Sequence, residues 1–185
     1  MQDMSVRHAP ISDAGETGSR RISMGGKGFT STAFGSLDAK GRVCIPATFR
    51  QVLESQNTQG MFVCPTLLKP IIDCFGQELY EYEMGQYPQV NPLFVSVKND
   101  FLDYFSENTV SLPFDSNGRV RLPDELIANA GLTDRVVFIG QNRKFQICTP
   151  EQHALLKKER MARLQAAMDA QAAIEQGKIQ SGEAL

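Results

Sequence analysis

Short hydrophobic runs separated by turn residues occur twice along the chain, and the two copies have the same order. In each copy a short apolar stretch leads into a turn, an alternating strand follows, and a proline then opens a helical pattern, at 47–53 or at 124–130. A glycine comes after each helical pattern, Gly60 in the first copy and Gly131 in the second. Two further hydrophobic runs close each copy, at 61–64 and 71–75 and again at 136–139 and 145–148. The pattern predicts two copies of a hairpin, helix, hairpin unit.

The turns contain the most similar residues of the two copies. Residues 38–46 read Asp-Ala-Lys-Gly-Arg-Val-Cys-Ile-Pro, and residues 115–123 read Asp-Ser-Asn-Gly-Arg-Val-Arg-Leu-Pro. Asp38 and Asp115 open the turns, where a carboxylate accepts hydrogen bonds from backbone amides two residues farther on. Gly41 and Gly118 supply the positive φ that closes a hairpin turn. We therefore expect these four residues to shape two equivalent turns.

The strand after each turn alternates between apolar and charged side chains. Alternation turns the valine and the isoleucine or leucine of each motif inward, and it directs Arg42, Arg119 and Arg121 outward. Lys40 adds a further cation in the first turn. Arginine can fork to guanine or clamp a phosphate, and a two-stranded ribbon fits the major groove of DNA. The recurrence of arginine at one motif position favours double-stranded DNA as a partner, with Lys40, Arg42, Arg119 and Arg121 as the contacts.

Neither short hairpin can bury enough apolar surface alone, so the two copies should interlock around one core.

The polar, Gly- and Ser-rich start of the chain is typical of a disordered leader. Between the copies, a proline-bounded segment at 86–92 precedes apolar residues at helical spacing in 101–105. The predicted divisions are a leader (1–30), a first repeat (31–83), a linker with a short helix (84–109), a second repeat (110–150), and a C-terminal helix and tail (151–185).

The C-terminal helix has a clear start signal. Thr149 is a good N-cap, Pro150 suits the first helical position, and Gln152 completes a capping box. From there to Gly177 the chain is rich in strong helix formers. Its apolar stripe is thin, consisting of Leu155, Met161, Leu164 and Met168. Two interpretations follow: a helix that packs at its start and frays outward, or a helix that binds a partner.

Composition and charge limit the class of protein. Hydrophobic residues make up 42% and charged residues 22% of the 185 residues, as in a soluble globular protein. A formal net charge of -2 excludes a polycation that coats nucleic acid through bulk charge, but it leaves room for a local basic patch. No apolar run approaches the roughly 18 to 20 residues of a membrane span. Arg20 and Arg21 precede no apolar segment, so we expect no export and a cytoplasmic location.

Catalytic and metal-binding patterns are scarce. Two aspartates from two repeats resemble the proton-sharing pair of aspartic proteases, but Ala39 follows Asp38 where those enzymes have a hydroxyl residue. A neighbouring arginine would also lower rather than raise the carboxyl pKa. Neither His8 nor His153 has a nucleophile partner at a recognisable spacing. The four cysteines, Cys44, Cys64, Cys74 and Cys148, lie too far apart for a zinc motif. We expect reduced thiols, no enzymatic activity, no cofactor and no metal.

The tandem Asp-x-x-Gly-Arg-Val-x-Ile/Leu-Pro blocks, with Gly131-Leu132 and the run 137–145 after the second, resemble the MraZ family. The resemblance covers roughly residues 31 to 160. It implies bacterial transcriptional regulators built from two AbrB-like swapped-hairpin units. The implied fold is α+β, mainly β, in which two interlocked repeats form a small barrel with a C-terminal helix.

The resemblance also implies a function and an assembly. Family membership implies a nucleoid-associated, ring-shaped homo-oligomer, an octamer or larger. It further implies binding to direct repeats ahead of the division and cell-wall gene cluster. Carried over to this sequence, Arg42 and Arg119 would meet DNA, while Asp38 and Asp115 would shape the turns.

Three features depart from the family pattern. The leader is long, Cys148 stands where the family commonly has tryptophan, and Cys44 occupies the face position that Arg121 has in the second copy. The two repeats are therefore expected to contribute unequally. Two alternatives stay open: an AbrB or antitoxin-type DNA-binding dimer, which has one motif per chain, and a cytoplasmic ring-forming scaffold that binds proteins instead of DNA.

Overall fold

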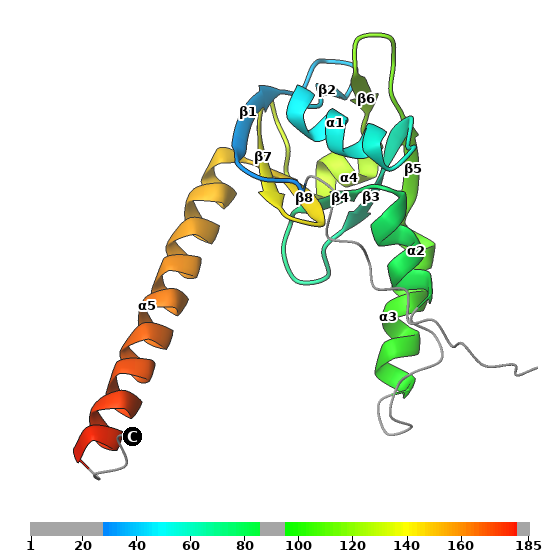
Figure 1. Cartoon of the computed structure of the whole chain (residues 1–185). Helices are drawn as coiled ribbons and strands as arrows, with labels where there is room; N and C mark the ends of the chain where they lie inside the picture. Colours follow the sequence, from blue (N-terminus) through cyan, green and yellow to red (C-terminus); the bar gives the residue numbers. More distant parts are fainter. Residues whose placement is uncertain (1–27, 86–94, 181–185) are drawn as a thin grey trace, which may run out of the picture.

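The computed structural model describes residues 28–85 and 95–180 (Figure 1). Most of the predicted leader and the proline-bounded segment 86–92 lie outside these residues. The described elements, in chain order, are β1 (Thr32–Ser36), β2 (Arg42–Cys44), α1 (Ala47–Ser55), β3 (Gly60–Pro65), β4 (Ile72–Phe75), α2 (Gln77–Gly85), α3 (Val95–Asn108), β5 (Val110–Pro113), β6 (Arg119–Arg121), α4 (Asp124–Asn129), β7 (Arg135–Gln141), β8 (Lys144–Cys148) and α5 (Pro150–Gln180). The chain is thus α+β and ends in a helix, and each repeat contributes four strands.

The strands form a six-stranded sheet and a separate two-stranded ribbon. The sheet has the order β1-β7-β8-β4-β3-β5, and the ribbon consists of β2 and β6. Strands of the two repeats pair with one another: β1 with β7, β4 with β8, and β2 with β6, all antiparallel. The predicted interlocking of the two copies is confirmed by these pairings.

The predicted barrel is wrong, because the sheet does not close. Its two edges are β1 and β5, and within residues 28–85 and 95–180 no pairing joins them. Each edge strand is followed by a turn and then by β2 or β6. These two strands pair with each other as a ribbon of their own and do not bridge the two ends of the sheet.

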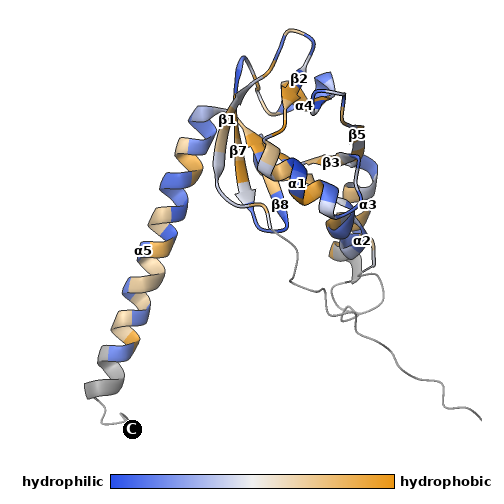
Figure 2. Cartoon of the chain, turned by 45° about the horizontal axis from the view of Figure 1, so that its top comes forward, coloured by the Kyte–Doolittle hydropathy of each residue, from blue (hydrophilic) through white to orange (hydrophobic). Residues whose placement is uncertain are grey.

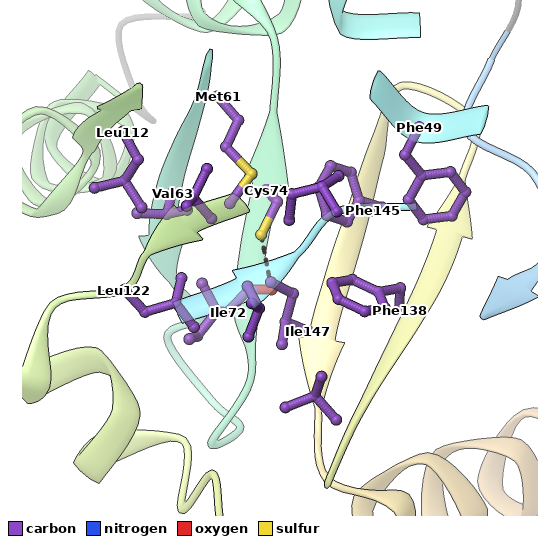
Figure 3. Packing of buried hydrophobic residues seen from close by; sticks show 14 of the residues in the cluster. Phe49, Met61, Val63, Ile72, Cys74, Leu112, Leu122, Phe138, Phe145 and Ile147 are labelled. Carbon is purple, nitrogen blue, oxygen red and sulfur yellow. Dashed lines mark hydrogen bonds between the residues drawn. The ribbon is translucent and has the colours of Figure 1, made fainter. Parts of the chain in front are cut away.

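One core cluster draws on both repeats. The inward-facing residues of the ribbon are fully buried, among them Val43, Val120, Ile45 and Leu122, as the alternation predicted. They meet an aromatic group formed by Phe29, Phe49, Phe138 and Phe145, and Figure 3 shows several of these side chains converging from different strands. Phe29 belongs to the predicted leader, yet it is buried and exchanges backbone hydrogen bonds with Asn142.

The helices that follow the two ribbon strands begin and end in the same way. Pro46 and Pro123 precede α1 and α4, where their fixed φ suits the entry into a helix. Each helix closes with a left-handed residue, Asn57 at φ 56 and Gly131 at φ 60. In both cases the paired backbone bonds of a Schellman motif are present. Asparagine tolerates this conformation, so the first copy needs no glycine there, and Gly60 instead begins β3.

Helix α3 lies in the predicted linker, where one short helix was expected, and a second helix, α2, ends the first repeat, where none was expected. The predicted helical residues 101–105 form the middle of the 14-residue α3. Phe105 of α3 and Tyr80 of α2 pack with Phe62 and Phe75 of the sheet. These aromatic contacts attach both helices to the sheet.

Helix α5 begins with the predicted capping box. The Gln152 amide donates to Thr149 Oγ1 at 3.2 Å, and the Thr149 amide donates to Gln152 Oε1 at 2.7 Å. Leu156 packs on a small cluster that includes Cys148. Beyond residue 160 the described side chains are exposed, and Figures 1 and 2 show the helix projecting from the body with polar and apolar residues mixed along it. None of the described helices has the length and apolar character needed to span a membrane.

Candidate nucleic-acid interface

The two repeated turns have the same backbone geometry. In the first turn the Gly41 amide donates to the Asp38 carbonyl at 2.9 Å, and the Asp38 amide donates to the Arg42 carbonyl at 2.9 Å. The second turn has the same two bonds, at 2.9 and 2.8 Å, between Gly118, Asp115 and Arg119. The two glycines have φ 70 and 69, a left-handed conformation in which an L side chain is strained. This pattern of a tight turn followed by a left-handed glycine is a common way to close a hairpin.

Each turn aspartate accepts hydrogen bonds through both of its carboxylate oxygens. Asp38 Oδ1 accepts the backbone amides of Lys40 and Arg42, both at 2.9 Å, while Oδ2 accepts Arg42 Nε at 2.8 Å. Asp115 repeats the arrangement with Asn117 and Arg119, again with Nε at 2.8 Å from Oδ2. One carboxylate oxygen therefore holds the backbone of the turn, and the other holds the guanidinium that follows it.

These contacts lower the pKa of both carboxyl groups. The side-chain hydrogen bond from Arg42 is the largest of the causes that lower the pKa of Asp38 from 3.8 to about 2. For Asp115 the backbone N–H of Arg119 is the largest cause of a lowered pKa, and its side chain contributes less. A proton-sharing catalytic pair requires one carboxyl group with a raised pKa. The turn aspartates are instead suited to fixing arginines in place.

The ribbon brings the three predicted arginines onto one face. Arg42 lies opposite Arg121, Val43 opposite Val120, and Cys44 opposite Arg119. Directly opposed residues of an antiparallel pair share a face, and successive residues alternate. Because both valines are buried, the three arginines and Cys44 point outward together. The side chains of Arg42 and Arg119 are 30% and 32% exposed, and that of Arg121 is 68% exposed. Lys40 is exposed at the first turn.

The face is less positive than its arginines suggest. Arg42 and Arg119 are ion-paired with the turn aspartates, and Arg121 Nη2 lies 3.6 Å from Asp124 Oδ1. A guanidinium held through one edge keeps its remaining N–H groups aimed in a fixed direction. Such preorganisation lowers the entropy lost on binding. The arrangement can therefore present donors to base edges or phosphates, with orientation contributing more than net charge.

Sequence reasoning missed one basic residue at this face. Arg50, in α1 of the first repeat, crosses to the turn of the second repeat, where its Nη1 donates to the Asn117 carbonyl at 3.3 Å. The matching position of the second repeat, four residues after the motif proline, is Ile127. Because the repeats differ there, their alignment provides no signal for Arg50.

An open groove of about 600 Å³ lies beside the first turn. It is lined by residues of that turn together with Arg121, Asp124 and Ile127. In residues 28–85 and 95–180, no group of three or more His, Cys, Asp and Glu side chains is arranged to hold a metal ion. Charged side chains of both signs line the groove together with apolar ones.

Comparison with known proteins finds a family and several relatives that have the same name. The MraZ family, described as "MraZ protein, putative antitoxin-like", matches residues 105–173, which include the second turn and much of α5. A protein of Xanthobacter autotrophicus named "Transcriptional regulator MraZ" is 37% identical over 123 residues, which cover 66% of this chain and 78% of the relative. Proteins of the same name from Methylocella silvestris and Parvibaculum lavamentivorans are each 36% identical, covering 66% and 69% of this chain and 74% and 80% of their own lengths.

Proposed function

The chain belongs to the MraZ family, and from this membership we propose that it is a transcriptional regulator that binds double-stranded DNA through the β2–β6 ribbon. The observation that carries the proposal is the common outward face of Arg42, Arg119 and Arg121 on a ribbon built from both repeats. A two-stranded ribbon has the width to enter the major groove, where arginine can fork to guanine. Lys40, Arg42, Arg119 and Arg121 are the proposed contacts, and Asp38, Gly41, Asp115 and Gly118 hold the turns that present them.

The repeats are proposed to be AbrB-like swapped-hairpin units. In this proposal the units span 31–83 and 110–150, and 84–109 joins them. The exchange of strands between the repeats supports this relation, because β1 pairs with β7 and β3 pairs with β5. The leader (1–30) and the C-terminal region (151–185) lie outside the two units. The proposed location is the cytoplasm, in association with the nucleoid.

Affinity is proposed to come from several copies of the ribbon. One protomer offers few cations for contact, and most of them are already paired with carboxylates. A ring of eight or more chains would engage several direct repeats at once, and the effective concentration would raise the overall affinity. The proposed targets are direct repeats ahead of the division and cell-wall gene cluster.

Footprinting tests this function directly. The purified chain is added to the DNA upstream of its own gene, and protection is expected over regularly spaced repeats. The affinity is expected to fall with salt, by about 0.9 log units per log unit of salt for each phosphate contacted. Absence of protection at low salt would overturn the proposal. Light scattering after size exclusion separates a ring from the dimer expected of an AbrB or antitoxin-type protein.

A second candidate function is a ring-forming scaffold for other proteins. The observation that favours it is α5, whose described side chains from residue 160 onward are exposed, including Met161, Leu164 and Met168. A scaffold would keep its assembly but would bind neither its upstream DNA nor an unrelated duplex at low salt. The two candidates therefore differ in one binding measurement.

A further inference from the structure

Arg50 connects the two repeats at the face proposed to meet DNA. It lies in α1, which Figure 1 shows alongside the β2–β6 ribbon, and its guanidinium reaches the turn before β6. We propose that Arg50 is a fifth basic residue of this face, which holds the second turn and binds a backbone phosphate of DNA. The proposal rests on the proposed function and names a contact that the repeated motif does not contain.

The contact of Arg50 with the second turn is close. Its Nη1 donates to the Asn117 carbonyl at 3.3 Å. A Cβ atom added at Gly118 would lie 1.4 Å from Nη1 and 2.5 Å from Cζ of Arg50. The guanidinium therefore occupies the space that any side chain at 118 would need. Gly118 thus serves two purposes, because it closes the turn and it admits Arg50.

Arg50 differs from the arginines of the ribbon in its ion pairing. Arg42, Arg119 and Arg121 each have a carboxylate within 4 Å. Among the residues that the structure describes, Arg50 has none, although its side chain is partly buried. A guanidinium has several N–H donors, and one carbonyl satisfies only part of them. An unneutralised arginine beside a DNA-facing turn is suited to a charge-assisted contact with a phosphate.

The position of Arg50 favours the phosphate backbone over base edges. The outward face of the ribbon carries Arg42, Arg119 and Arg121, so these side chains would enter the groove. Arg50 comes from the helix at the flank and is held against the main chain at Asn117. A side chain at the flank of an inserted ribbon faces the strands that border the groove, where the phosphates lie. The contact should therefore be independent of DNA sequence.

Among the described residues, no arginine makes an equivalent contact with the first turn. Ile127 occupies the place of Arg50, and its Cδ1 would lie 3.1 Å from a Cβ atom at Gly41. The proposed phosphate contact is thus confined to the second turn. Each protomer would hold the DNA more firmly through one half of its ribbon.

The test compares Arg50→Ala with Arg160→Ala, a matched loss of one arginine from the exposed part of α5. Affinities for the upstream fragment and for an unrelated duplex are measured over a range of salt concentrations. Arg50→Ala is expected to reduce the slope of log affinity against log salt on both duplexes by about 0.9 for each bound protomer, since each loses one phosphate contact. Arg160→Ala should leave both slopes unchanged. Arg50→Lys retains the charge and should restore the slope.

An Arg50→Ala slope equal to that of Arg160→Ala would overturn the proposal. A lower melting temperature of Arg50→Ala beside that unchanged slope would mean that Arg50 only stabilises the fold. Failure of the proposed function looks different, because the parent protein would then bind neither duplex at low salt. If the parent binds and Arg42→Ala weakens binding while Arg50→Ala does not, only the role of Arg50 is lost.

Discussion

The two turns of this protein have the same backbone and different neighbours. An aspartate and a left-handed glycine build both, with hydrogen bonds that agree within 0.1 Å. The surroundings diverge: Ile127 packs near Gly41, whereas the guanidinium of Arg50 lies against Gly118. On the ribbon itself Cys44 takes the place that Arg121 has in the other copy. The residues that the two motifs share thus give the same turn in two different surroundings, where the neighbouring positions differ in chemistry.

The largest expected effect comes from removing the arginine that both turns share. Arg42→Ala and Arg119→Ala should each weaken binding to the upstream fragment by about 1–3 kcal/mol, because each removes a directed contact from the ribbon face. Gel shift or fluorescence anisotropy measures the affinity, and light scattering checks that the assembly is unchanged. If both variants bind the fragment like the parent, these arginines do not contact DNA.

Substitution of the two turn glycines tests what differs between the turns. Gly41→Ala and Gly118→Ala should each lower the free energy of unfolding by about 1–2 kcal/mol, since alanine is strained at positive φ. Gly118→Ala should also displace Arg50 and reduce the salt slope, while Gly41→Ala should not. Thermal melts at fixed protein concentration and salt titrations measure the two effects. In an Arg50→Ala background the two alanine variants should have equal salt slopes.

Cys44→Arg makes the ribbon more symmetric. It adds a guanidinium opposite Arg119, at the position that matches Arg121. The slope of log affinity against log salt should become steeper by at most about 0.9 for each bound protomer, the value for one added phosphate contact. Cys44→Ser is the control and should bind like the parent. A Cys44→Arg protein with the parental slope would indicate that this corner of the ribbon does not approach DNA.

The smallest expected effect concerns the carboxyl groups. A lowered carboxyl pKa stabilises the folded state above the unfolded pKa, so the contribution of Asp38 is complete above its usual 3.8 and is lost as the pH falls to about 2. Arg42→Ala removes the largest cause and should return the pKa of Asp38 toward its usual value. Arg119→Ala retains the backbone N–H that dominates at Asp115, so that pKa should stay lowered. NMR titration of the carboxyl carbons distinguishes these outcomes, and equal shifts would contradict the difference between the turns.

The local features of the fold were predictable from sequence. The turns, the prolines before α1 and α4, and the capping box of α5 depend on residues within a few positions of each other, and each is present as expected. The interlocking was predictable as well, because neither hairpin can bury its apolar face alone. Helix α2 was not expected, since its nine residues contain no buried side chain and little apolar periodicity.

Long-range features were harder to predict. Whether a sheet closes depends on how its edge strands are placed, and no single segment of the sequence encodes that placement. The contact between Arg50 and Asn117 spans 67 positions and has no counterpart in the other repeat. The ion pairs within the turns follow from the motif spacing, yet the sequence did not reveal that they neutralise much of the charge on the ribbon. The sequence thus led to the proposal of DNA contacts, whereas the ion pairs around these residues were seen only in the structure.

The origin of the ribbon, with one strand from each repeat, has a consequence for how the protein can be divided. A cut between α2 and α3 would give two fragments, each with half of the ribbon and with sheet strands deprived of their partners. Neither fragment should regulate a promoter when it is expressed alone. Co-expressed fragments should reassociate through strand pairing and recover activity together, which makes the chain a natural candidate for a split reporter.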